Sequence, residues 1–169
     1  MNFVVRGFGK GSDRSALKGG DLYVARGPKN ALLVLAGPTS NDTLDLVLAI
    51  EGEYFDDTPP PYRVYRSGFS AVPALVEGSI EIRPLEGSRA FLIADESMAG
   101  TLAIAPDGTS YVRCKSREWI NIESGEQADK PNGCASYSQW RIVWRDGDRL
   151  ETLAVFGVPS VDAVSKAGT

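Results

Sequence analysis

Short runs of strand-forming residues recur about every ten residues along this chain, and residues that favour turns separate them. This spacing is typical of antiparallel β proteins, in which short connections join neighbouring strands. The 169 residues include 18 glycines and 10 prolines, an excess that suits many tight turns. No segment carries the pattern of a long helix, and we find no internal repeat. The sequence therefore predicts an all-β fold.

Turn residues mark where hairpins are expected. Pro106-Asp107-Gly108 combines a proline at the second turn position with Asp and Gly, a strong turn signature. Asp146-Gly147-Asp148 fits either a two-residue or a three-residue loop. Hairpins are thus predicted around four turn segments: 27–30, 86–87, 106–108 and 146–148. The glycines of segment 18–21, in contrast, predict a mobile loop.

Segment 44–51 shows the clearest alternation. Leucine or isoleucine occupies every second position from Leu44 to Ile50, with Asp45 between the first two of them. A period of two predicts a strand with one leucine face, although Thr43 also fits the cap of a short helix. Further strands are predicted over 3–8, 22–26, 31–35, 62–66, 69–77, 79–83, 90–94, 101–105, 110–115, 118–123, 140–144 and 150–156.

Evenly spaced antiparallel strands on this scale form either two packed sheets or a closed barrel. We predict one domain over residues 1–157, a jelly-roll-like antiparallel β-sandwich, with a β-barrel as the second choice. Residues 158–169 are expected to form a flexible C-terminal tail.

Composition excludes several classes of function. The chain has no histidine, which removes the commonest general base, the commonest metal ligand and every imidazole triad. A net charge of −4 gives no support to phosphate binding, so we expect no nucleic-acid partner. No apolar run is long enough to span a membrane. We expect no cofactor and no metal site.

The N-terminal sequence lacks the pattern of a secretory signal, which favours a cytoplasmic protein, or a secreted one whose signal has been removed. The chain has two cysteines, Cys114 and Cys134. In an oxidising compartment a disulfide between them would close the intervening loop. We favour the alternative of two unlinked thiols in a reducing compartment.

The richest group of chemical side chains surrounds residues 51–62. Carboxylates and aromatic rings together are the groups that recognise sugars, and carboxylates alone attract calcium, although no calcium-loop spacing is present. A solvated acidic loop is the simpler interpretation. The candidate ligand-binding residues here are Glu51, Glu53, Tyr54, Asp56, Asp57 and Tyr62.

Three tryptophans are the other candidates for ligand binding. Alternation along 140–145 places Trp140 and Trp144 on one strand face. Such a face is usually core, but if exposed it would be an aromatic platform for a glycan or a protein partner. Trp119 is included as a third candidate ring.

These observations predict a non-catalytic β-sandwich that acts through its surface, by recognising a protein partner or by self-assembly. The first alternative is a carbohydrate-binding module. The second is a glycan-active enzyme with paired carboxylates, since that chemistry needs no histidine; Glu51, Glu53, Asp95, Glu96, Glu118 and Glu123 are acids of the required type. No catalytic residue is identified, and the ligand, strand order and oligomeric state are not predicted.

Overall fold

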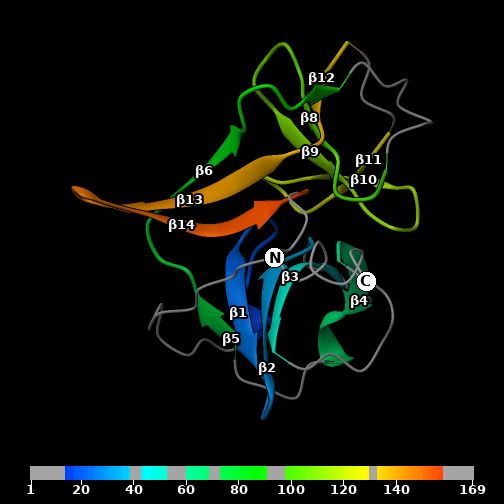
Figure 1. Ribbon diagram of the computed structural model, residues 1–169. Helices are drawn as coiled ribbons and strands as arrows, with labels where there is room; N and C mark the ends of the chain where they lie inside the picture. Colours follow the sequence, from blue (N-terminus) through cyan, green and yellow to red (C-terminus); the bar gives the residue numbers. More distant parts are fainter. Residues whose placement is uncertain are drawn as a thin grey trace, which may run out of the picture.

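The computed structural model describes residues 14–38, 43–52, 60–68, 73–90, 98–129 and 133–157. Within these ranges the chain forms three antiparallel sheets, and its helical segments are two short 3-10 turns, η1 (Arg14–Ala16) and η2 (Arg66–Gly68) (Figure 1). The predicted all-β sandwich is confirmed. None of the helical turns in the described ranges has the length and apolar character needed to cross a bilayer.

Sheet 1 has five strands in the order β4-β3-β2-β1-β5, so its first four strands follow one another as a meander. Its hairpin between β1 and β2 forms at the predicted turn, with Arg26 paired to Ala31. The strands are β1 (Leu22–Arg26), β2 (Asn30–Leu35), β3 (Leu44–Gly52), β4 (Tyr62–Tyr65) and β5 (Pro73–Leu75).

Sheet 2 has six strands in the order β11-β10-β9-β8-β12-β7, and sheet 3 has three in the order β14-β13-β6. The strands of sheet 2 are β7 (Arg89–Ala90), β8 (Leu102–Ile104), β9 (Ser110–Arg113), β10 (Trp119–Asn121), β11 (Gln127–Ala128) and β12 (Ala135–Tyr137). Those of sheet 3 are β6 (Ser79–Pro84), β13 (Trp140–Asp146) and β14 (Arg149–Phe156).

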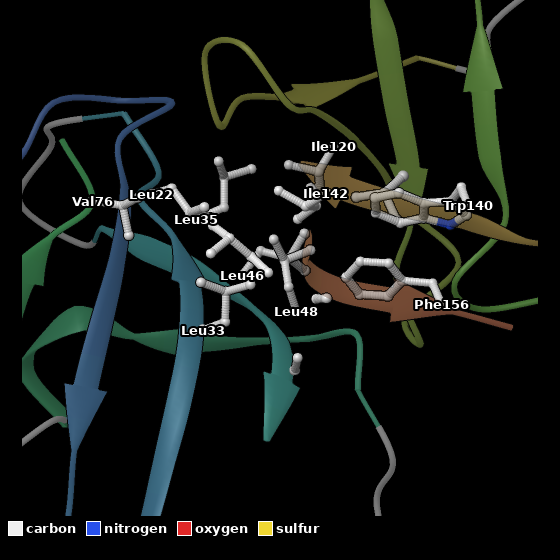
Figure 2. Close-up of a cluster of buried hydrophobic side chains, with 14 of the residues drawn as sticks. Leu22, Leu33, Leu35, Leu46, Leu48, Val76, Ile120, Trp140, Ile142 and Phe156 are labelled. Carbon is white, nitrogen blue, oxygen red and sulfur yellow. The ribbon is translucent and has the colours of Figure 1, made fainter. Parts of the chain in front are cut away.

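All three sheets contribute to one hydrophobic core. Leucines of sheet 1, among them Leu33 and Leu46, point toward Trp140 and Phe156 of sheet 3 and Ile120 of sheet 2 (Figure 2). The Trp140 and Phe156 rings are stacked, with centroids 3.8 Å apart. Sheet 1 is therefore one layer of the sandwich, and sheets 2 and 3 pack against its inner face.

The outer face of sheet 1 is also buried, which the sequence did not predict. Tyr23, Val34 and Val47 form a second cluster there with Leu17, each with at most 1% of its surface exposed. The alternation along β3 also changes, because a β-bulge lies where Leu33 and Val34 pair with Ala49 and Val47. Beyond that bulge Ile50 packs on the outer cluster instead of continuing the leucine face.

Asp45 lies on this outer face and is fully buried. Its carboxylate accepts hydrogen bonds from Tyr23 Oη at 2.6 Å, from the Gly37 amide at 2.8 Å and from the Arg66 guanidinium at 2.9 to 3.2 Å. Burial, followed by the hydrogen bond to Asp45, raises the pKa of Tyr23 well above its ordinary value. The network joins β1, β3 and η2, and every partner satisfies a charge or dipole that burial would otherwise penalise.

Two sequence predictions about connections are changed. Glu86-Gly87 does not close a hairpin, because β6 pairs with β13 in sheet 3 whereas β7 pairs with β12 in sheet 2. The turn instead carries the chain from one sheet to the other. Segment 18–21 is not a loose loop but a turn held by Gly20 N to Ala36 O and Ala36 N to Asp21 O hydrogen bonds. The predicted strand 3–8 and tail 158–169 lie outside the described residues.

Replacing Arg66 with alanine should leave a buried carboxylate without its charged partner. We expect Arg66→Ala to lower the free energy of unfolding by about 3–5 kcal/mol, measured by urea denaturation at pH 7. Arg63→Ala is the control, since Arg63 pairs with the more exposed Glu118 at 3.3 Å and should cost about 1 kcal/mol or less. Equal losses in both variants would contradict the role given to the buried pair.

Candidate functional site

The main candidate site is a cleft of about 480 Å³ at the junction of the three sheets. Its volume lies within the roughly 300–1,000 Å³ that is usual for small-molecule sites. Seven of its lining residues are aliphatic, and polar groups contribute about as much of the surface that faces the cleft as apolar groups do. These residues are Leu22, Leu35, Leu48, Ile80, Ile82, Ile122 and Ile142.

Sheet 1 forms the floor of the cleft. Leu22, Leu35 and Leu48 come from its three central strands and share the inner face because alternation places them there. Figure 2 shows these leucines directed toward Ile142 of sheet 3. The floor is therefore rigid, since each of these side chains belongs to the main core.

Strand β6 forms one wall. It contributes Ile80 and Ile82, which are half-buried and cross-strand partners of Trp144 and Ile142. Within the described chain β6 is an edge strand, paired only with β13. A wall made from an edge strand leaves backbone polar groups available beside the apolar side chains.

Sheet 2 forms the opposite wall, with Ile122 beside Ser110 and Gly108. The Ile122 amide donates to Ser110 O at 2.9 Å, which holds these two residues together. Gly108 belongs to the predicted Pro106-Asp107-Gly108 turn, which does close the β8–β9 hairpin. In that turn Asp107 Oδ1 accepts a hydrogen bond from the Thr109 amide at 2.9 Å.

Glycines close the end of the cleft where sheets 1 and 2 meet. Gly20 has a φ of +88° and approaches the turn after β10 so closely that a Cβ would lie 1.8 Å from Glu123 O. Gly125 lies equally close to the Ala36 backbone, since a Cβ on Gly125 would lie 2.0 Å from Ala36 O. Only glycine permits such contacts between two backbones. The two turns therefore fix the separation of the sheets that the cleft spans.

Two acidic residues, Glu81 and Glu123, complete the lining, and alternation along β6 directs the Glu81 side chain to the face opposite to Ile80 and Ile82. Glu81 accepts hydrogen bonds from Arg83 Nε at 2.9 Å and Arg145 Nε at 3.0 Å. The hydrogen bond from Arg83, followed by that from Arg145, holds the pKa of Glu81 below its ordinary value. A carboxylate-dependent glycosidase requires a general acid with a raised pKa, so Glu81 is unsuited to that role.

The three tryptophans offered as ligand contacts belong to the core, which corrects the platform interpretation. Trp140, Trp144 and Trp119 are 0%, 5% and 3% exposed. Trp140 stacks on Phe156 and donates from Nε1 to Gly100 O at 2.7 Å, and Trp144 donates to Glu77 O. Burial of this much aromatic surface stabilises the sandwich and leaves no indole face for a surface ligand.

The acidic segment is only partly described. Glu51 is exposed near the end of β3, and Tyr62 is half-buried at the start of β4, packed on the outer cluster. Glu53, Tyr54, Asp56 and Asp57 lie outside the described residues. Ligand binding by this segment therefore stays a prediction.

The two cysteines are not joined by a disulfide. Cys114 is buried in the main core with Sγ 3.0 Å from Ser116 Oγ, and Cys134 is half-buried. Burial, the larger cause, and the charge of Asp107 raise the pKa of the Cys134 thiol. A raised pKa lowers the fraction of thiolate and hence the reactivity of this thiol. Among the residues that the structure describes, no three or more acidic or thiol side chains gather as metal ligands would.

Sequence reasoning did not identify the cleft as a site. Its residues come from segments as far apart as Gly20 and Ile142, and each aliphatic one resembles an ordinary core position. Comparison with family models, curated proteins and solved structures finds no match for this chain. The function must therefore be inferred from the cleft itself.

Replacing Gly20 with alanine should disturb the contact that closes the cleft. The expected loss exceeds the roughly 1–3 kcal/mol of backbone strain alone, because the new Cβ would also clash with Glu123 O. Gly87→Ala is a matched control, with a φ of +75° but no neighbouring atom within 4 Å. Chemical denaturation of both variants measures the difference, and equal losses would mean that the turns do not press together as described.

Proposed function

We propose that this protein binds a small, largely apolar molecule in the cleft between its three sheets. The observation that carries the proposal is a cleft of about 480 Å³ between the sheets whose lining includes seven aliphatic residues. The space between packed sheets is usually filled by side chains to the density of an organic crystal. A cleft that stays open on a rigid floor is where an apolar ligand gains most from leaving water.

The chemistry of the lining narrows the class of ligand. Each methylene transferred from water to the cleft contributes about 0.8 kcal/mol, which corresponds to about fourfold in affinity. Among the lining residues Ser110 supplies a hydroxyl, whereas the Glu81 carboxylate is held by Arg83 and Arg145 on the face of β6 opposite to Ile80 and Ile82. Because a hydroxyl both donates and accepts hydrogen bonds and no lining residue is cationic, an aliphatic alcohol fits the cleft better than a fatty acid.

Like the prediction from the sequence, this proposal describes a non-catalytic binding protein. It differs in placing the binding site in the cleft between the sheets instead of on the outer surface. Glu81 is engaged by two arginines, and no residue of the lining is histidine, cysteine or lysine. The lining therefore offers shape and apolar surface, the properties of a binding site, in place of an activated nucleophile. Recognition of a protein partner or a glycan stays a prediction.

The test is titration with N-phenyl-1-naphthylamine, a neutral dye that fluoresces in apolar sites, followed by displacement with linear alcohols of increasing length. We expect saturable binding, with alcohol affinity rising about fourfold per methylene until the cleft is full. Ile122→Trp should abolish dye binding by filling the cleft. Ile104→Trp is the control, since Ile104 is a half-buried residue of the same core that is not among those lining the cleft.

Three results would contradict the proposal. These are absence of saturable binding to the native protein, equal binding by both tryptophan variants, and alcohol affinities that do not depend on chain length. Circular dichroism of each variant establishes that it is folded, so that lost binding reports on the cleft.

A further inference from the structure

Strand β14 is the longest exposed sheet edge in the part of the chain that the structure describes. It has eight residues and pairs on one side only, with β13. The other edge strands, β4, β5, β6, β7 and β11, have between two and six residues. Natural proteins usually keep edge strands short or protect them with charged side chains, proline or β-bulges, because an open edge pairs with another strand. The β-bulge of this strand lies between Thr152 and Ala154, so it leaves residues 149–152 regular. Residues 149–156 contain neither lysine nor proline.

The exposed portion of this edge includes an apolar side chain. Leu150 is 49% exposed, in contrast to the buried Leu153, Ala154 and Phe156 further along the strand. Figure 1 shows the tip of the β13–β14 hairpin extending away from the rest of the sandwich. The first half of β14 is therefore accessible along its free edge.

The hairpin geometry determines which peptide groups face outward. Asp146 pairs with Arg149, so Gly147-Asp148 is a two-residue loop, and Gly147 has the positive φ of such turns. The pair that closes a two-residue loop is hydrogen-bonded, and hydrogen-bonded pairs then alternate along the ladder. Arg149 thus bonds to β13, whereas the peptide groups of Leu150 point to the free edge.

The charges on either side of Leu150 are complementary to those of a second, antiparallel copy of the same strand. Arg149 and Glu151 lie on the same strand face, two residues apart, with Arg149 Nη2 2.9 Å from Glu151 Oε2. When a strand pairs antiparallel with its own copy about Leu150, Arg149 faces Glu151 of the copy and Glu151 faces its Arg149. Opposite charges directly across a strand pair stabilise it.

We propose that two copies of this chain pair antiparallel along β14, about a twofold axis through Leu150. The peptide groups of the two leucines exchange hydrogen bonds, and their exposed side chains cover each other on one face. On the other face the two arginines and two glutamates alternate in sign. A second copy is the occupant because the same short sequence supplies both halves of the charge pattern, as a twofold interface requires. This inference is independent of ligand binding in the cleft.

The test is sedimentation velocity from about 10 μM to 1 mM, a range that covers weak dimers. The native chain should pass from monomer to dimer as its concentration rises. Arg149→Glu and Glu151→Arg should each shift the midpoint at least tenfold, because each places like charges opposite one another. The two variants mixed in equal amounts should associate again, since their interface restores both opposite-charge pairs.

The double variant Arg149→Glu/Glu151→Arg should also form homodimers. Recovery in the mixture separates pairing along β14 from any structural role of the two side chains, because mixing would not repair a folding defect. The double variant alone does not, since it also restores the ion pair within each chain. A native chain that stays monomeric up to 1 mM would overturn the proposal. So would single variants that associate as the native chain does, or a mixture that fails to recover.

Discussion

The packing of Trp140 links the three sheets of this protein. Its ring stacks on Phe156, its indole nitrogen donates to Gly100 just before β8, and its cluster includes the leucines of sheet 1. A fully buried side chain of this size accounts for a large share of the core, since burial of Trp contributes several kcal/mol. Trp140 therefore contacts residues of sheets 2 and 3 and packs with them on the leucine face of sheet 1.

The cleft is a consequence of this arrangement. Sheets 2 and 3 both pack on sheet 1 but are not hydrogen-bonded to each other. In the described chain β6 pairs only with β13, so it forms the edge of sheet 3. The core is closely packed around Trp140, whereas the cleft lies beside β6. There Ile80 and Ile82 line the cleft together with Ile122 and the three leucines of its floor. The glycine contacts of Gly20 and Gly125 hold the turns of sheets 1 and 2 together at the end of that space.

Sequence periodicity predicted most strands well, because alternation and turn residues act locally. Strands β1 and β13–β14 are found almost as expected, and the Pro106-Asp107-Gly108 turn closes its hairpin. Two short strands, β11 and β12, were missed, since two or three residues carry no period. Glu86-Gly87 was misread because turn chemistry does not reveal which sheet the next strand joins.

The candidate site was harder to predict than the fold, for a physical reason. A period of two distinguishes the two faces of β3 but does not show whether each face is covered, so it could not reveal that Asp45 is fully buried. Similarly, alternation places Leu22, Leu35 and Leu48 on one face without showing that a space lies above them. Tryptophans attract attention as binding residues, yet here their large apolar surfaces belong to the core.

Isoleucine methyl resonances test most directly whether the cleft is an open ligand site. With the isoleucine δ1 methyl groups labelled with carbon-13, titration with a linear alcohol should shift Ile80, Ile82, Ile122 and Ile142, which line the cleft. Ile50, on the outer cluster of sheet 1, should not move. Shifts confined to the first four residues are the predicted result. Unchanged spectra, or shifts that include Ile50 equally, would contradict the account.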